Sequence, residues 1–266
     1  MTHRKQHVWT RWRRVVQFTV ALFYLALPVL HLFDVRTVAG TLASLRIGSF
    51  DLTEPASALA GALASRTFTT TLLIGIAPVV LLALVAGPVF CSWVCPWGLI
   101  SEGLDKVRNR IAPRKWTGET WRVSRWPRYV LLAVLVALSA AAALPLVALL
   151  SAPRAITSLP LEIIYLRMIS PLTAIVLLGV LIIELVAPRR IWCRVLCPVG
   201  TTAALLRTPK TLSVRWEESR CACPRTAPCH THCPWGVDPR KKMTYDACTN
   251  CMGCVDVCPH DALALR

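Results

Sequence analysis

Four long apolar stretches alternate with polar segments along the chain. They run from 15–33, 70–90, 129–150 and 169–187, and each is rich in Leu, Val and Ala. A helix needs about 20 residues to cross a hydrocarbon core of about 30 Å. Helices also satisfy their own backbone hydrogen bonds in lipid, where no water is available. The pattern therefore predicts four membrane-spanning helices.

Composition and charge support this interpretation. The chain is 55% hydrophobic and 17% charged, which is too apolar for a soluble globular protein. Its net charge of +16 would suit a nucleic-acid-binding protein, but twenty-five of the thirty Lys and Arg residues lie before the first stretch, between the second and third, or after the fourth. Basic loops stay in the cytoplasm. Both termini and the loop 101–128 are therefore predicted to be cytoplasmic, and the charge does not indicate nucleic acid.

The two halves of the chain repeat one pattern. The first and third apolar stretches follow WRR at 12–14 and WPR at 126–128, and the second and fourth are followed by FCSWVCPWG at 90–98 and WCRVLCPVG at 192–200. A repeat in which each copy starts and ends on the same side is a parallel one. We therefore expect a duplicated hairpin with both C-x3-C-P motifs at the cytoplasmic face.

The C-x3-C-P motifs offer two thiols each, one helical turn apart, and the proline stops the helix after them. If the repeat brings its equivalent ends together, four thiolates can bind one cluster or a transition metal. Alternatively each pair cycles between dithiol and disulfide or serves in assembly, or the thiols are only small hydrophobic side chains that pack at a helix end. The sequence leaves these alternatives open for Cys91, Cys95, Cys193 and Cys197.

A change in composition marks a second domain. From residue 207 onward the chain is polar and holds eight of its twelve cysteines. The segment CTNCMGCVDVCP at 248–259 is the C-x2-C-x2-C-x3-C-P run of bacterial ferredoxins. A zinc site would instead show two paired knuckles. We expect a transmembrane domain at 1–206 and a cytoplasmic ferredoxin-type domain at 207–266.

The upstream cysteines of this tail have the unusual spacing C-x-C-x5-C-x3-C-P, interrupted by His230 and His232. These histidines are expected to be solvated loop residues, with a substitute cluster ligand as the alternative. In ferredoxins the last cysteine of each run ligates the other cluster. This exchange predicts two [4Fe–4S] clusters. The first is held by Cys221, Cys223, Cys229 and Cys258, and the second by Cys233, Cys248, Cys251 and Cys254. The Cys-Ala-Cys pair predicts a first cluster of altered type or potential, and the reduced thiolates agree with a cytoplasmic tail.

The expected fold is thus an all-α membrane domain of four helices with a small C-terminal α+β domain of the bacterial ferredoxin type. The chain resembles the NapH/MauN-type membrane ferredoxins in this layout, in FCSWVCP at 90–96, in the C-terminal run and in DLTEP at 51–55. The resemblance implies a quinol dehydrogenase component of the bacterial cytoplasmic (inner) membrane, which passes electrons to a periplasmic reductase or dehydrogenase system. It also implies a soluble iron–sulfur partner similar to NapG or MauM.

Quinol chemistry needs a group that handles protons. Paired haem ligands are not expected, because of the six histidines only His31 touches a predicted span. Glu184 lies inside the fourth span, where a carboxylate is costly unless it is used or paired. It is our candidate catalytic group beside the four C-x3-C-P cysteines, although it can equally reach Arg189 or Arg190. A second candidate quinone site lies at the external side and comprises His31, Asp34, Glu162, Tyr165 and Arg167.

Two functions follow from these features. The first is quinol-linked electron transfer between the membrane pool and the cytoplasmic clusters. The alternative is a membrane assembly or maturation factor, whose C-x3-C-P thiols handle a metal while the clusters supply reducing equivalents. A redox sensor is a third class. Reduction of the clusters by quinol would favour the first.

Overall fold

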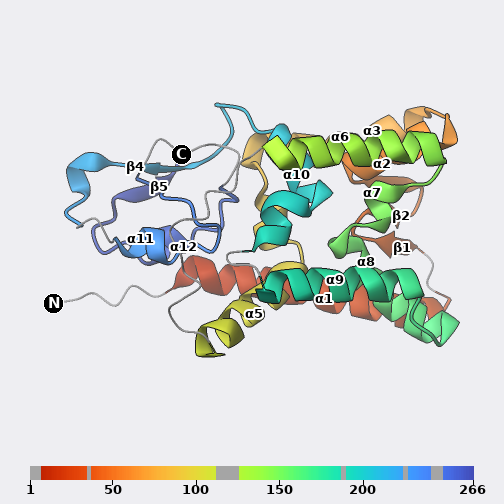
Figure 1. Cartoon of the computed structure of the whole chain (residues 1–266), viewed down its shortest axis with the longest axis horizontal. Coiled ribbons are helices and arrows are strands. Elements are labelled where there is room, and N and C mark those ends of the chain that lie inside the picture. Colours follow the sequence, from red (N-terminus) through yellow and green to blue (C-terminus); the bar gives the residue numbers. More distant parts are fainter. Residues whose placement is uncertain (1–6, 35–36, 112–125, 187–189, 224–226, 241–247) are drawn as a thin grey trace.

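The computed structural model describes residues 7–34, 37–111, 126–186, 190–223, 227–240 and 248–266. Figure 1 shows the long helices in two layers, with α1 and α9 along one side, α3 and α6 along the other, and short helices between them. The ferredoxin-type tail lies beyond the end at which α1 begins. This arrangement separates an apolar helical part from a cysteine-rich part.

An apolar helix occupies each of the four predicted stretches. They are α1 (Val8–Leu32), α3 (Thr70–Ala86), α6 (Trp126–Ala142) and α9 (Pro171–Val186). Within the described residues, α1 alone is long and apolar enough to cross a membrane by itself, and the other three have 16 or 17 residues. The prediction of apolar helices is therefore confirmed, whereas four membrane crossings remain a prediction.

Two of these helices end earlier than the sequence pattern predicts. The second apolar stretch reaches residue 90, but α3 stops at Gly87, whose φ of 72° is the left-handed conformation that glycine allows. The third reaches residue 150, but α6 ends at Ala142 and Ala143 has a φ of 51°. There the backbone N–H of Leu144 donates to the Ser139 carbonyl, and that of Leu146 donates to the Ser139 hydroxyl. The predicted ends at 90 and 150 were wrong because hydropathy does not reveal such caps.

The segment after α1 folds inward instead of forming a simple external loop. An antiparallel sheet of β1 (Val38–Thr41), β2 (Ser44–Ile47) and β3 (Phe50–Thr53) leads into α2 (Pro55–Ser65). Strand β3 packs on α3 so closely that a Cβ on Gly75 would collide with the Asp51 carbonyl oxygen. A side chain at this position would push the strand off the helix. Strand β3 thus lies along α3, and the chain then continues into α2, which packs on α6.

The second half contains a matching short helix. After α6 the chain forms α7 (Leu146–Leu149), α8 (Ala152–Leu161) and the π-helical turn η1 (Glu162–Leu166) before α9. Helix α8 begins at Ala152, which is fully buried, and packs between α1 and α9. Its Thr157 hydroxyl accepts a hydrogen bond from the N–H of Leu42, at 3.1 Å. Each half therefore contributes a short helix that starts inside the molecule, which is a further element of the repeat.

Each C-x3-C-P motif lies at a break between two helices. The first joins α4 (Val89–Trp93) to α5 (Trp97–Ile111), and the second joins the π-helical turn η2 (Trp192–Leu196) to α10 (Pro198–Leu205). π-helical turns are frequent at functional sites. The backbone is extended at Cys197, with ψ at 117°, so the chain changes direction beside its thiol.

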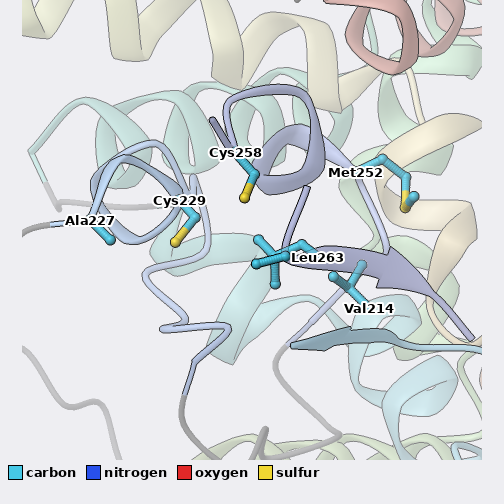
Figure 2. Packing of buried hydrophobic residues seen from close by; sticks show 7 residues of the cluster. Val214, Ala227, Cys229, Met252, Cys258 and Leu263 are labelled. Atoms are coloured by element: carbon cyan, nitrogen blue, oxygen red, sulfur yellow. The ribbon is translucent and has the colours of Figure 1, made fainter. Parts of the chain in front are cut away.

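The tail has a small two-stranded sheet. Strand β4 (Val214–Trp216) pairs antiparallel with β5 (Leu263–Leu265), and the remaining elements are η3 (Glu218–Arg220), α11 (Pro228–Thr231) and α12 (Gly253–Asp256). Figure 2 shows Cys229 and Cys258 beside Leu263, in a core that also includes Val214 and Met252. This α+β arrangement agrees with the expected ferredoxin type.

Asp256 of the tail caps the first residues of α1. Its carboxylate accepts hydrogen bonds from the N–H groups of Trp9 and Thr10, at 3.2 and 2.8 Å, and from the Thr10 hydroxyl at 2.6 Å. The α1 N-cap residue, His7, makes no such bond with its own side chain. A carboxylate at a helix N-terminus also stabilises the helix dipole. The tail is thereby attached to the helical domain.

Replacing Asp256 with Ala should loosen this attachment. The substitution leaves the N–H groups at the start of α1 unpaired, which lowers the free energy of local opening there by about 2 kcal/mol. Amide hydrogen exchange at Trp9 and Thr10 should therefore be roughly 30-fold faster. Exchange measured by mass spectrometry tests this, with exposed Glu218→Ala as the control. Unchanged exchange at the start of α1 would show that Asp256 does not hold the two parts together.

Candidate functional site

The two C-x3-C-P motifs meet at one cavity. Its lining includes Cys91, Cys95, Cys193, Cys197, Phe90, Trp97, Ala152, Pro153, Trp192 and Val199. We call this the four-thiol cavity. Cys95 and Cys197 are 6% and 5% exposed, and all four cysteines are free thiols. The structure thus brings together the equivalent cysteines of the repeat, although they are about a hundred residues apart in sequence.

Burial makes these thiols weak acids. It raises the pKa of Cys95 to about 12 and that of Cys197 to about 11, and it raises the pKa values of Cys91 and Cys193 well above the ordinary value. Four such thiols without a cation would be protonated at neutral pH. Metal ligation requires thiolates, so a bound centre would displace their protons and neutralise their charge.

The surroundings of the cavity fit an anionic cluster. The first residues of α8, Ala152 and Pro153, lie at the cavity, and a helix N-terminus stabilises negative charge. The indole N–H groups of Trp97 and Trp192, both lining residues, are buried and have no hydrogen-bond partner among the residues that the structure describes. Buried donors normally have partners. The sulfur atoms of a cluster would supply acceptors at this place.

The four-thiol cavity has the ligand number of either a single metal ion or a cluster. Among the described residues, no three His, Cys, Asp or Glu side chains are placed to hold one metal ion. A tetrahedral zinc ion draws its four ligands within about 2.3 Å of one centre. A [4Fe–4S] cluster distributes its thiolates over four iron atoms. Both centres take four thiolates, which the lining of the cavity supplies.

Glu184 lies next to the four-thiol cavity. Glu184 is 3% exposed, and its Oε1 atom has no hydrogen-bond partner within the described part of the chain. It faces Arg190, Ser101 and the backbone of Cys193. Arg190 also pairs with Asp105, at 3.4 Å. Glu184 therefore adjoins both candidates for its role, the cysteines and an arginine, while Arg189 lies outside the described residues.

Residues of the second candidate quinone site make hydrogen bonds to nearby parts of the chain. Glu162 accepts hydrogen bonds from the Ser158 and Thr173 hydroxyls and from the Ser170 N–H, at 3.1, 2.6 and 2.9 Å. His31 bonds to the Val38 carbonyl at 2.6 Å. Tyr165 donates to the Pro28 carbonyl, and Asp34 and Arg167 have φ values of 61° and 51° at turns. These contacts hold together the external ends of α1, α8 and α9.

Four cysteines of the tail surround a second cavity. Its lining includes Cys233, Cys248, Cys251 and Cys254, together with Val214, Trp235 and Met252. Burial raises the pKa of Cys233 to about 12, and the neighbouring Cys251 raises it further. Cys254 is affected in the same way, first by burial and then by Cys251 and Cys248. These are the four residues predicted to hold the second cluster.

The remaining four tail cysteines form a neighbouring group. Burial and then the charges of Cys221 and Cys258 raise the pKa of Cys223. Cys229 and Cys258 belong to the tail core, where Figure 2 shows them near each other, and Cys221 and Cys223 pack against it. The grouping has the exchanged pattern expected of a ferredoxin, although which thiols are ligands stays a prediction. His232 is exposed and stacks on His7 at 6.5 Å, outside both groups.

Direct hydrogen bonds join the first C-x3-C-P motif to the tail. The Ser92 hydroxyl donates to the Thr249 carbonyl at 2.6 Å, and the Trp93 indole N–H donates to the Asn250 carbonyl at 3.0 Å. Ser92 and Trp93 lie between Cys91 and Cys95, while Thr249 and Asn250 lie between Cys248 and Cys251. The Asn250 side chain in turn donates to the Ala86 carbonyl. The loops that carry the two sets of thiols are therefore in contact.

This contact was not predicted from the sequence. The only signal is an asymmetry in the repeat: the first motif has Ser-Trp-Val between its cysteines, where the second has Arg-Val-Leu. The hydrogen-bonding side chains of Ser92 and Trp93 indicate that the first motif has a bonding partner that the second lacks. The sequence pattern does not identify the segment that supplies this partner.

Comparison with known proteins agrees with this geometry. A family model described as a 4Fe-4S binding domain matches residues 68–115 and 169–215, and a second model with the same description matches residues 242–264. The methylamine utilization ferredoxin-type protein MauN of Methylobacillus flagellatus is 30% identical, over 85% of this chain and 76% of MauN. The chain belongs to the NapH/MauN family of ferredoxin-type proteins.

Other relatives extend the similarity over nearly the whole chain. The ferredoxin-type protein NapH of Escherichia coli is 26% identical over 98% of this chain and 90% of NapH. MauN of Methylorubrum extorquens is 28% identical over 96% of this chain and 77% of that protein. No solved structure matches. The predicted resemblance is thus confirmed, and the chain is an iron–sulfur electron-transfer protein related to NapH and MauN.

The family matches bear on both cysteine-rich regions. The two segments of the first 4Fe-4S model each contain one C-x3-C-P motif, and the second model contains the tail run. A NapH/MauN-type chain therefore has iron–sulfur features inside its helical part as well as in its tail. The number of clusters and the role of each cysteine are not given by these matches.

Proposed function

We propose that this NapH/MauN-type protein oxidises quinol in the bacterial cytoplasmic membrane and transfers the electrons through its iron–sulfur sites. The observation that carries the proposal is the contact between the four-thiol cavity and the tail, made by Ser92 and Trp93. It connects a site within the apolar helices to the ferredoxin cysteines. Electron transfer between a lipid-soluble donor and a soluble acceptor requires such a connection.

Exposed apolar side chains support the membrane setting. They occur on all four long helices, and so many large exposed apolar side chains would be costly in water. Examples are Phe18 and Leu22 on α1, Leu73 and Leu81 on α3, Val130 and Leu138 on α6, and Ile175 and Ile182 on α9. Lipid would cover this surface. We therefore propose four spans. In the three spans with shorter helices, residues that flank the helix would complete the crossing.

The distribution of basic residues supports cytoplasmic ends, because twenty-five of the thirty Lys and Arg residues fall in the segments predicted to lie on that side. Two of them, Arg13 and Arg14 at the start of α1, pair with Glu102 of α5, at 3.1 and 2.6 Å. Reporter fusions after Gly98 and after Gly200 should therefore be active with a cytoplasmic reporter and inactive with a periplasmic one. Periplasmic activity at both positions would reverse the topology and expose the cysteines to an oxidising compartment.

We propose that the four C-x3-C-P thiols hold a third cluster in addition to the two in the tail. Cys91, Cys95, Cys193 and Cys197 would be its ligands, and the unpartnered Trp97 and Trp192 N–H groups would donate to it. A bound [4Fe–4S] cluster supplies one-electron transfer chemistry. Glu184 adjoins Cys193 and is the residue we assign to proton uptake there.

The final acceptor is proposed from the family. Two of the relatives are named for methylamine utilization. We propose that electrons leave this chain through a soluble iron–sulfur partner, similar to NapG or MauM, toward a periplasmic reductase or dehydrogenase system. The lipid and the quinone pool are the other partners.

Quinol-dependent reduction of the tail clusters tests the proposed function. Protein purified without oxygen and placed in lipid nanodiscs should show reduced-cluster EPR signals after addition of menaquinol or ubiquinol, as it does with dithionite. Signals that appear with dithionite but with neither quinol would contradict quinol oxidation. That result would favour the assembly or maturation role, in which reducing equivalents come from another source.

A further inference from the structure

A second cavity lies beside the four-thiol cavity. Its volume is about 200 Å³, and it is enclosed by α3, α10 and the β3–α2 junction. Most of its lining is aliphatic or aromatic, with Ala83, Phe90 and Val199 among the lining residues. Drug-sized ligands occupy pockets of about 300–1,000 Å³. This cavity is smaller, so it suits one ring of a molecule whose remaining part extends outside the cavity.

The cavity has one buried polar end. Glu54 lines it and is 6% exposed, and its two carboxylate oxygens accept hydrogen bonds from the N–H groups of Ala56 and Ser57, at 3.1 and 2.7 Å. The Thr202 side chain lies against this carboxylate. Carboxylate oxygens have about four lone-pair sites in total. Glu54 can therefore accept a further hydrogen bond from a ligand while it caps α2.

The opposite side of the cavity is apolar and reaches the surface. Leu82 of α3 lines the cavity and is also 46% exposed, on a helix whose outer face carries Leu81 and Leu73. An aliphatic tail could leave past Leu82 into the lipid that this face would contact. The cavity therefore combines a buried acceptor for a hydroxyl group with an apolar exit.

The two cavities share a wall. Phe90 and Val199 line both of them. The Glu54 carboxylate is within electrostatic reach of Cys91 and Cys197, which line the four-thiol cavity. A ring bound in the second cavity would thus lie one layer of side chains from the thiols.

We propose that this second cavity binds the ring of a lipid quinol, with Glu54 accepting a hydrogen bond from a ring hydroxyl and the tail leaving past Leu82. The inference rests on the proposed function, because it names the site at which that function's substrate binds. It differs from the site expected at the external ends of the helices and from one at Glu184. A polar substrate would leave most of its hydrogen-bonding groups unpaired against the aliphatic walls.

Photoaffinity labelling with an azidoquinone tests the site directly. In full-length protein in nanodiscs, the label should attach to peptides of α3 and α10, and excess unlabelled quinone should compete. Ala83→Phe fills the cavity and should reduce labelling at least tenfold. Leu81→Phe, on the exposed face of the same helix and outside the cavity lining, should label normally. Glu54→Gln should weaken labelling about tenfold by loss of a charged acceptor.

The outcomes separate the site from the function. Iron content and reduction by dithionite should be unchanged in Ala83→Phe, which shows that this variant is folded. Labelling confined to the external turn at Glu162 or to the surroundings of Glu184, or full labelling of folded Ala83→Phe, would overturn the proposed site. Competitive labelling of α3 and α10 without any quinol-dependent cluster reduction would support the site and remove quinol oxidation as the function.

Discussion

Cys91→Ala and Cys193→Ala should each abolish quinol-dependent reduction of the tail clusters, and the double variant should be no worse than either single one. The two cysteines come from different halves of the chain but line the same cavity. If the four thiols hold one centre, loss of any one thiol disables that centre. The effects of the two substitutions on reduction are then non-additive. Independent pairs would give partial losses that add.

EPR of each variant after addition of quinol, with dithionite as the reference, measures this effect. Val195→Ala is the matched control, because Val195 lies between Cys193 and Cys197 and is not among the cavity-lining residues. It should retain normal reduction. Normal reduction in either single cysteine variant would show that the thiols only pack at the helix ends.

Cys251→Ser should remove one tail cluster and leave the other. Cys251 lines the cavity of the second group, with Cys233, Cys248 and Cys254. Cys229→Ser is the matched variant for the first group, which is packed in the tail core. Each substitution should lower iron and acid-labile sulfide by one cluster, and the double variant by two.

EPR of the reduced variants distinguishes the clusters that remain. Both variants should keep the signal of the cluster proposed for the four-thiol cavity. Of the two tail signals, the one kept by Cys251→Ser should be the one lost from Cys229→Ser. The same remaining tail signal in both variants would refute the exchanged ligand sets. Stoichiometric zinc with no sulfide in the unsubstituted tail would refute the ferredoxin assignment itself.

The cysteine patterns were the most informative part of the sequence. Spacing alone identified both C-x3-C-P motifs as one repeat, and the structure brings Cys91, Cys95, Cys193 and Cys197 to a single cavity. It also placed the tail run correctly as a ferredoxin-type segment, which the family model matches. Such patterns are readable because ligand chemistry fixes the residue type and its spacing together.

The short internal helices could not be predicted in the same way. Helices α2 and α8 have 11 and 10 residues, which is too short for a span, and both have a proline in the first turn. Their segments therefore look like loops between hydrophobic stretches. Glu54 falls between the first and second apolar stretches, where the pattern predicts no helix, although it lines an interior cavity. Only the packing of β3 on α3 places it there.

The tail contact depended on tertiary structure as well. Ser92 and Thr249 are 157 residues apart, and the asymmetry of the repeat at Ser92 does not identify Thr249 as its partner. Their hydrogen bond arises because α3 ends at Gly87, so that α4 turns toward the tail. The sequence predicted a helix through residue 90, which would have hidden this turn.

Mössbauer spectroscopy with iron and sulfide analysis of the full-length protein, purified without oxygen, tests the central claim most directly. The claim is that the twelve cysteines form three sites of four thiols each. It predicts three [4Fe–4S] clusters per chain and no cysteine open to alkylation before denaturation. Two clusters per chain, with Cys91, Cys95, Cys193 and Cys197 alkylated or joined in disulfides, would contradict it.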